Sequence, residues 1–289
     1  MKASLIALGF VAVLVLPAAA ADYVLITPAD PVIGSPTVIY LDLLRQVIPD
    51  LAQNGPAWTG HLPPGIGHID GPDAEGAIPD SVTIRSVDVR TVAADGKATI
   101  WVIADLGDGG NLGTYTLLAA FSDGPAPKLL DATEVDSDRL TGFSGTPLRI
   151  SSRDEAVLID SEYSNSSQTY QSQDLVFLRG GKFMLIDHFF AFGTRSCDFQ
   201  QLEILSVTAA PGGPGFWPIT AVLTRSQAET PKVESSQEDE NGDTCLEEET
   251  AHFADKDFTA VYAWDEKAGR YFTKSTELDD LATADSDLF

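Results

Sequence analysis

Residues 81–106 read SVTIRSVDVRTVAADGKATIWVIADL, and this stretch indicates the fold. Two runs rich in Val, Ile and Thr, 81–92 and 98–106, flank the dipeptide Asp95-Gly96. Such a dipeptide between β-branched runs favours the tight turn of an antiparallel hairpin. The stretch therefore predicts two neighbouring antiparallel strands.

The first of these runs changes phase along its length. Val82 and Ile84 share one face of an extended chain, whereas Val87 and Val89 fall on the other parity. A slip of one residue moves side chains to the opposite face of a strand. We therefore expect a β-bulge within one strand, near residues 85–86.

Similar short runs, separated by turn residues, recur along the rest of the chain. They lie at 113–121, 128–135, 155–160, 174–178, 182–192, 202–210, 217–224, 258–264 and 270–275. This pattern predicts an all-β fold, an antiparallel meander forming a sandwich. A regular period of about 40 to 50 residues is missing, so a small or irregular β-propeller is the alternative.

One N-terminal helix is predicted near 36–48. Ser35 is a suitable N-cap and Pro36 suits the first helical position, while Pro49 disfavours helical geometry at the residue before it. The apolar stripe of this helix consists of Tyr40, Leu41, Leu44, Val47 and Ile48.

The remaining boundaries follow from composition. We expect a single β-rich domain over 22–276, with long loops at 54–80 and 227–256, and an acidic, mobile C-terminal tail at 277–289. The polar run SEYSNSSQTYQSQ, residues 161–173, is interpreted as a loop before the strand at 174–178.

The N-terminus has the three parts of a secretory signal peptide: a basic start, an apolar run over 5–16, and a small-residue site. The run is shorter than the roughly 20 residues needed to cross a bilayer, and no later segment suits a span. We expect residues 1–21 to be removed near Ala20 or Ala21, which predicts a soluble protein of the bacterial periplasm or medium.

Charge restricts the partners. Without Lys2, 17 basic side chains face 43 acidic ones, a net charge of −26. Such a surface repels nucleic acid, because nucleic-acid binding depends on Lys and Arg neutralising phosphates. A cationic protein, peptide or metal ion is the kind of partner that it favours.

The chain has two cysteines, Cys197 and Cys245. In an oxidising compartment an even pair predicts a disulfide. Closing a loop of this length stabilises a fold by about 4 kcal/mol in the chain-entropy description.

The stretch ESSQEDENGDTCLEEET, residues 234–250, is the most acidic in the chain. If Gly242 is the sixth position of an EF-hand loop, the candidate calcium ligands are Asp239, Asn241, Asp243 and Glu248. The first position is Gln237 and the ninth is the disulfide candidate Cys245, so the stretch is interpreted as an acidic excursion between strands. A calcium ion is the cofactor that such a loop would bind.

Histidines supply further candidates. His61, His68 and Asp70 are ligand types that suit zinc or copper, although their spacing matches no short motif. His188 is expected to share a face with Ile186 and to be half-buried beside one hydrogen-bond partner. It could act as a general base, but no nucleophile is paired with it in sequence.

The sequence contains no phosphate-binding glycine loop, no dinucleotide fingerprint and no CxxC pair. Ser144 also lacks the glycine spacing of a hydrolase elbow. The first hypothesis is therefore an exported, non-enzymatic protein that binds a partner through 234–250 and the polar run with Tyr163 and Tyr170. Alternatives are a hydrolase of cell-wall or extracellular polymers that uses paired carboxylates, and a calcium-stabilised module.

Overall fold

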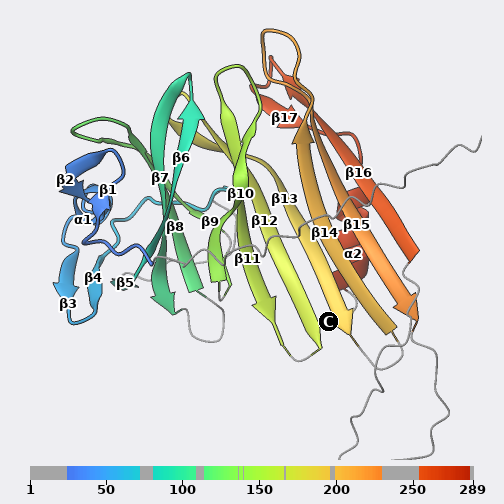
Figure 1. Ribbon diagram of the computed structural model, residues 1–289, viewed down its shortest axis with the longest axis horizontal. Helices are drawn as coiled ribbons and strands as arrows, with labels where there is room; N and C mark the ends of the chain where they lie inside the picture. Colours follow the sequence, from blue (N-terminus) through green and yellow to red (C-terminus); the bar gives the residue numbers. More distant parts are fainter. Residues whose placement is uncertain are drawn as a thin grey trace, which may run out of the picture.

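The computed structural model describes residues 25–71, 81–108, 114–135, 137–138, 140–165, 167–195, 199–229 and 254–286. These residues form antiparallel sheets with two short helices, so the all-β class is confirmed. Successive strands are also neighbours in space, which gives a meander along most of the chain (Figure 1).

The N-terminal part forms two small sheets around a helix. Its elements are β1 (Pro31–Val32), β2 (Ser35–Ile39), α1 (Tyr40–Leu44), β3 (Ala52–Asn54), β4 (Ala57–His61) and β5 (Ser81–Ile84). The chain then builds a four-stranded sheet from β6 (Val87–Ala94), β7 (Lys97–Asp108), β8 (Thr114–Ser122) and β9 (Leu129–Val135).

An eight-stranded sheet follows, with its strands in sequence order. Its strands are β10 (Leu140–Arg149), β11 (Glu155–Ser164), β12 (Gln168–Arg179), β13 (Lys182–Arg195), β14 (Phe199–Ala209), β15 (Ile219–Glu229), β16 (Ala254–Asp265) and β17 (Arg270–Phe272). Helix α2 (Glu277–Ser286) ends the described chain.

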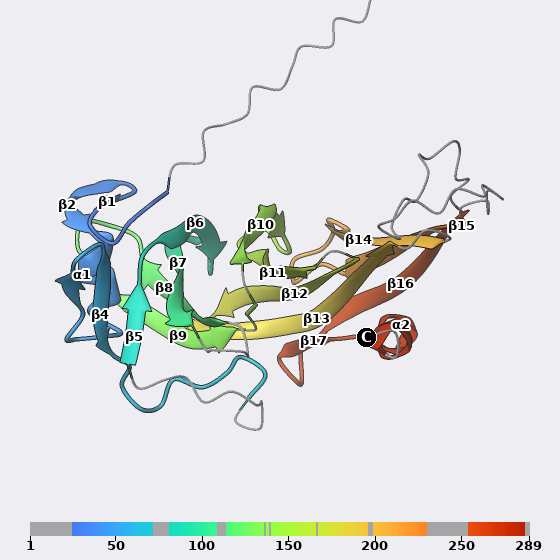
Figure 2. The same cartoon turned by 90° about the horizontal axis from the view of Figure 1, so that it is seen from below.

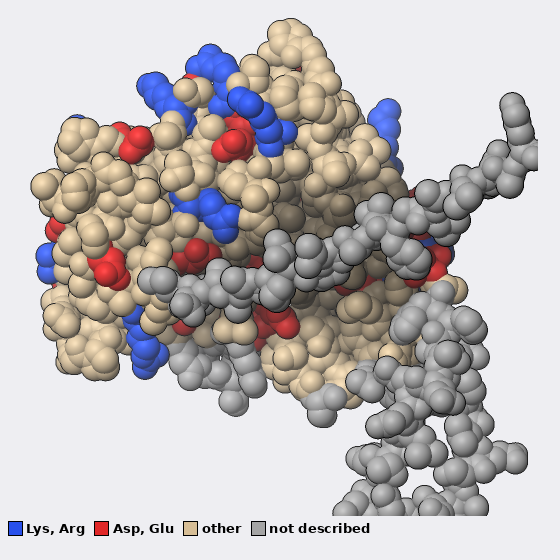
Figure 3. Space-filling model, in the orientation of Figure 1, with Lys and Arg blue, Asp and Glu red and all other residues tan. Residues whose placement is uncertain are grey.

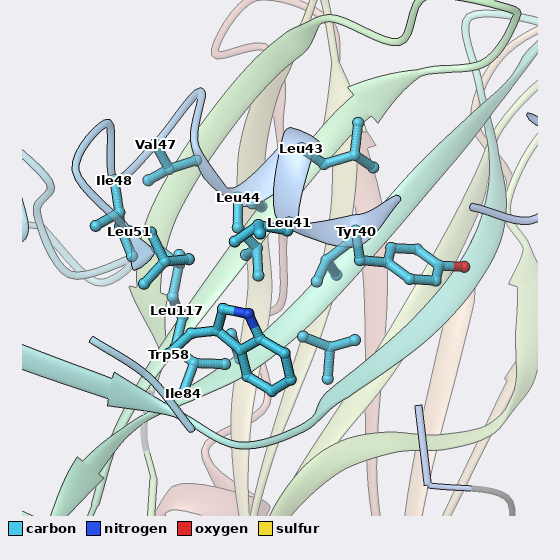
Figure 4. Packing of buried hydrophobic residues seen from close by; sticks show 14 of the residues in the cluster. Tyr40, Leu41, Leu43, Leu44, Val47, Ile48, Leu51, Trp58, Ile84 and Leu117 are labelled. Carbon is cyan, nitrogen blue, oxygen red and sulfur yellow. The ribbon is translucent and has the colours of Figure 1, made fainter. Parts of the chain in front are cut away.

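The sheets are stacked in layers (Figure 2). One face of β6–β9 packs on α1 and β4–β5 through residues such as Leu117 and Trp58 (Figure 4). Its other face packs on β11–β13, where the Trp101 ring meets the edge of Phe183 at a centroid distance of 4.9 Å. The far face of β11–β13 packs in turn on β15–β17. The sandwich is therefore repeated, because the β6–β9 sheet and the β11–β13 part of the eight-stranded sheet each have two buried faces.

The predicted hairpin turns are present. Asp95 and Gly96 both have positive φ, 52° and 77°, between β6 and β7. Gly180 and Gly181, at 58° and 75°, form the turn between β12 and β13 in the same way. Paired positive φ values match the twist of antiparallel strands, which explains why these residue types occupy the turns.

The helix is shorter than predicted. Residues 35–39 are strand β2, which pairs with β1, and α1 begins only at Tyr40. The β-branched residues after Pro36 favour the extended chain, and Asp42 caps the helix by accepting the Ile39 N–H at 3.2 Å. All five residues of the expected stripe are nevertheless buried.

The phase slip in 81–92 is not a bulge within one strand. β5 ends at Ile84 and β6 begins at Val87, and the two strands belong to different sheets. Val82 and Ile84 of β5 and Val87 and Val89 of β6 all pack into the core between these two sheets, together with Trp58. The slip therefore marks the chain's passage from one layer to the next.

The polar run 161–173 is a hairpin and not a loop. β11 and β12 pair without interruption from Ala156–Phe177 to Ser164–Thr169. The side chain of Asn165 closes the turn by accepting the N–H groups of Ser167 and Gln168, both at 2.9 Å. Part of the expected loop 54–80 is likewise strand, because Ala57–His61 form β4.

The eight-stranded sheet splits between β13 and β14. These strands share two pairs, Thr194 with Gln201 and Arg195 with Gln200, and then diverge. Helix α2 lies against β13 and β16 where the sheet opens, and its Leu281 is buried. Residues 277–286 thus form a docked helix, where the sequence suggested an acidic tail. No helix in the described ranges is long and apolar enough to cross a membrane.

Candidate functional site

Three aromatic rings form a row on the face of β11–β13 that is turned toward β6–β9. Tyr163 and Tyr170 are cross-strand partners with ring centroids 5.0 Å apart and planes 23° from parallel. Tyr170 and Phe190 continue the row with centroids 5.8 Å apart. All three side chains are half-buried. We call Tyr163, Tyr170 and Phe190 the aromatic row.

Next to this row, three side chains form a chain of hydrogen bonds across β12 and β13. The Nδ1 atom of His188 lies 2.8 Å from Asp174 Oδ1, and its Nε2 atom lies 3.4 Å from Ser172 Oγ. The side chain of Asp174 is 3% exposed and that of His188 is 35% exposed. We call Ser172, His188 and Asp174 the open cluster, because its imidazole reaches solvent.

Strand geometry brings these three residues together. Ser172 and Asp174 are two positions apart on β12, so their side chains leave the same face. His188 lies directly opposite Asp174 on β13, and directly opposed side chains in an antiparallel pair are in contact distance. The imidazole can therefore touch the carboxylate beside it and the hydroxyl one pair further on.

A β-bulge sets the orientation of His188. Leu175 pairs with Asp187 but Val176 pairs with Leu185, so Ile186 is an extra residue in β13. Ile186 packs with the core shared with β15–β17, whereas His188 points to the opposite face. The prediction that His188 and Ile186 share a face was wrong for this reason, although a half-buried histidine with a hydrogen-bond partner is what the structure contains.

The connection between β9 and β10 borders the site. The Asp138 carboxylate accepts the Tyr170 hydroxyl at 3.0 Å, and the Asp138 N–H donates to Ser161 Oγ. Thr141 Oγ1 lies 3.1 Å from Ser161 Oγ and also lines a hollow of about 170 Å³ between β6–β7 and β10. A row of hydroxyl groups, Thr141, Ser161 and Ser172, therefore runs across three strands beside the aromatic row.

A second polar cluster lies where the sheet splits. The guanidinium of Arg225 on β15 binds Glu203 Oε1 of β14 at 2.6 Å and both oxygens of Asp285 of α2 at 2.5 and 2.6 Å. The side chains of Glu203 and Asp285 are 0% and 1% exposed. We call Arg225, Glu203 and Asp285 the closed cluster.

Burial shifts the titration of this cluster. Loss of solvent raises the pKa of the Glu203 carboxyl to about 7, and the charge of Asp285 adds to the rise. The Phe192 N–H and the Arg225 guanidinium oppose it. Glu203 and Asp285 are paired carboxylates, but Arg225 occupies the space between them. The closed cluster thus joins α2 to the sheet and gives no support to a carboxylate-based hydrolase.

One more carboxylate is perturbed on the far side of β13. Burial raises the pKa of Asp187, although its carboxylate accepts hydrogen bonds from the Tyr262 hydroxyl and the His188 N–H. Burial also raises the pKa of Tyr262, and the hydrogen bond to Asp187 adds to that shift. This pair faces the core between β13 and β16, so it is structural.

Another hollow, of about 500 Å³, lies at the opposite end of the strands, beside the β6–β7 and β12–β13 turns. Its polar groups serve the scaffold: Asp95 accepts the Gly180 N–H, and Thr99 accepts the Trp101 indole N–H. Basic residues such as Lys97 lie at this end, and Lys and Arg side chains gather along the upper rim in Figure 3. The described residues that line this hollow include no pair of side chains suited to proton transfer.

The histidine candidates have local partners. His61 Nδ1 lies 2.6 Å from Asp50 Oδ2, and His68 Nδ1 lies 3.4 Å from Asp70 Oδ2. The pKa of Asp50 is lowered because its carboxylate accepts hydrogen bonds from the backbone N–H and from the imidazole of His61. Within the described ranges no three His, Cys, Asp or Glu side chains gather as a metal site would require. The structure therefore does not join His61, His68 and Asp70 into one ligand set.

Other candidates lie outside the described residues. These are the calcium-ligand candidates Asp239, Asn241, Asp243 and Glu248, and both cysteines of the expected disulfide, Cys197 and Cys245. The disulfide, the calcium site and the acidic partner surface at 234–250 remain predictions.

Sequence reasoning missed the open cluster. It considered His188 as a base but placed Ser172 in a loop, which hid the pairing of β12 with β13. The available signal was the S-x-D pattern at 172–174, followed by a Gly180-Gly181 turn and a histidine in the next strand. If no bulge is assumed, strand pairing counted back from that turn places residue 174 opposite residue 187. The predicted register would therefore still have been one residue off.

Comparisons with protein families, with curated proteins and with solved structures found no match to this chain. Inference about function therefore starts from the chemistry of the aromatic row and the open cluster.

Proposed function

We propose that this protein is an exported binding protein for neutral saccharides, and that its recognition surface is the aromatic row with the polar groups beside it. The binding class is that of the first sequence-based hypothesis, with the surface moved from 234–250 to the face of β11–β13. Export rests on the signal-peptide pattern of residues 1–21 alone.

The aromatic row is the observation that supports this proposal. Sugar rings have an apolar face of C–H groups and an edge of hydroxyls, so their sites combine aromatic side chains with a few placed polar groups. Here three near-parallel rings lie beside Ser172, His188 and Asp138, which offer donors and acceptors. Paired strands hold these groups more rigidly than loops would.

Charge favours an uncharged ligand. The chain carries a formal charge of −25, and the carboxylates of Asp138 and Asp174 lie within the site. An anionic ligand would be repelled by this field, and a cationic one would have many other acidic positions to occupy. A neutral oligosaccharide gains from stacking and hydrogen bonding without either effect.

The test is calorimetric titration of the purified protein with a panel of neutral glucose and N-acetylglucosamine oligomers. We expect Tyr170→Ala to weaken binding at least about tenfold, which corresponds to about 1.4 kcal/mol, because it removes the middle ring of the row and the hydroxyl that binds Asp138. Phe272→Ala is the matched control, because Phe272 on β17 is 40% exposed and lies in another layer. Equal affinities for both variants, or no binding across the panel, would refute the proposal.

A further inference from the structure

The open cluster carries chemistry that binding alone does not need. We infer that Ser172 is an acyl-accepting nucleophile, with His188 as its general base and Asp174 as the residue that positions His188. The substrate class is a carboxylic ester carried on a neutral saccharide. The saccharide part rests on the proposed function, whereas the reactivity of Ser172 rests on the geometry of the cluster.

The hydrogen bonds define the proton arrangement. A carboxylate can only accept, so the bond to Asp174 Oδ1 places the imidazole proton on Nδ1. The lone pair of Nε2 then faces Ser172 Oγ. This is the order of roles required of a nucleophile, its base and the group that orients the base. The 3.4 Å separation is long, and such contacts shorten when a substrate binds.

The burial of the three side chains suits these roles. The side chain of Asp174 is 3% exposed, which protects its bond to the imidazole from water. His188 is 35% exposed and Ser172 is half-buried, so an ester can approach the hydroxyl. Phe190 lies directly opposite Ser172 on β13, and its ring provides an apolar contact next to the reacting oxygen.

The reaction proceeds in two balanced steps. Ser172 Oγ attacks the ester carbonyl carbon while its proton passes to His188 Nε2, and that proton then leaves with the alcohol as the C–O bond breaks. Water attacks the resulting acyl-serine, again losing a proton to His188, and the serine recovers that proton as the carboxylic acid is released. The overall change is hydrolysis of one ester by one water.

The reaction should be slow. β12 is an inner strand whose ladders to β11 and β13 run on both sides of Ser172, so its backbone N–H groups serve the sheet and not a developing oxyanion. Without such donors, general-base assistance of about 10² to 10⁴-fold is the main contribution. We therefore expect activated esters to react measurably and amides not to react.

The experiment uses the full chain with two probes, p-nitrophenyl acetate and a fluorophosphonate. We expect a burst of one p-nitrophenolate per chain, and mass spectrometry should locate the phosphonyl group on Ser172. Ser172→Ala should abolish both signals, while the control Ser206→Ala should keep them, because Ser206 lies on the exposed side of β14. Labelling that survives in Ser172→Ala would overturn the inference.

Two further variants test the roles of the other residues. His188→Gln should slow acylation at least tenfold and remove its increase with pH, which arises as the imidazole loses its proton. Asp174→Asn should slow acylation similarly, because an amide can stabilise the other imidazole tautomer. Melting temperatures close to that of the unmodified protein would show that the fold is intact. Full acylation in His188→Gln would overturn the role of the base.

Failure of this inference is distinguishable from failure of the proposed function. Both readouts, saccharide binding and labelling of Ser172, are measured on the unmodified protein. Saccharide binding without labelling of Ser172 would overturn the inference and leave the binding function. Labelling without saccharide binding would leave the nucleophile and overturn the saccharide assignment.

Discussion

The open and closed clusters contain similar groups in different surroundings. In each, a nitrogen-bearing side chain lies between two oxygen-bearing ones: His188 between Asp174 and Ser172, and Arg225 between Glu203 and Asp285. Arg225 joins β14, β15 and α2, its guanidinium is bonded to both carboxylates, and its side chain is 16% exposed. His188 joins two adjacent strands and reaches solvent.

The difference indicates which cluster holds the fold and which remains available for a ligand. A guanidinium is always charged and bonds both carboxylates at once, so the closed cluster fixes helix α2. An imidazole can gain or lose a proton near neutral pH and has one nitrogen directed at a hydroxyl. Substitutions in the closed cluster should therefore change stability, and those in the open cluster should change chemistry.

The largest expected effect is that of Arg225→Ala. It leaves two buried carboxylates without a counter-charge, which should lower the free energy of unfolding by about 3 to 5 kcal/mol. Urea denaturation measures this change. Lys182→Ala is the control, because the pair of Lys182 with Asp131 has a 73% exposed lysine and should contribute at most about 1 kcal/mol. Equal losses would remove the distinction between buried and surface pairs here.

The next effect is on pH dependence. The pKa of Glu203 is raised from 4.5 to about 7 by burial, so the folded protein holds this proton more tightly than the unfolded chain does. The contribution of Glu203 to stability should be fully present below about pH 4.5 and should be lost as the pH rises toward 7. The raised pKa of Asp187 acts in the same direction. Glu203→Gln should make the decrease shallower in urea titrations at several pH values.

Glu266→Gln is the control for that titration, because Glu266 is exposed in the turn before β17. It should leave the pH profile unchanged. A profile for Glu203→Gln that has the same slope as the original would show that Glu203 is ionised in the folded protein throughout this range.

A smaller change in stability is expected for His188→Gln. Glutamine can still donate to Asp174, so the loss should be about 1 kcal/mol, the net value of a single hydrogen bond. Thermal denaturation followed by circular dichroism measures it. A loss as large as that of Arg225→Ala would identify His188 as part of the scaffold.

The smallest effect is expected for Ser172→Ala, whose free energy of unfolding should stay within about 0.5 kcal/mol of the original. Ser172 accepts or donates one long hydrogen bond at a half-buried position, so its removal strands no charge. A marked loss of stability in urea denaturation would mean that the contact between Ser172 and His188 holds β12 and β13 together.

The sequence predicted much of the scaffold because short-range signals specify it. Turn residues such as Asp95 and Gly96, and the β-branched runs between such turns, identify the hairpins and the all-β class. The start of α1 was wrong because β-branched residues after Pro36 pair with β1, a tertiary contact that local capping rules do not include. The repeated stacking of the sheets was not evident from the sequence, because a strand that is buried on both faces reads as a plain apolar run.

The site was harder to predict than the scaffold. Residues 161–173 have the composition of a loop, yet their backbone groups are satisfied by pairing. Two of their side chains, Tyr163 and Tyr170, belong to the aromatic row. The extra residue Ile186 reverses the face that His188 occupies, and no propensity marks a bulge there. The Arg225 contacts join β14 and β15 to α2, and Asp285 lies 60 residues beyond Arg225 in the sequence.

The most direct test of the account is proton–carbon NMR of the histidine rings during titration with neutral glucose and N-acetylglucosamine oligomers. His188 lies on β13 and His61 on β4, which belong to different sheets, so each reports on its own surroundings. We predict that the His188 resonances shift and saturate while those of His61 stay in place. Shifts at His61 or His68 with none at His188 would contradict the assignment of the β11–β13 face as the recognition surface.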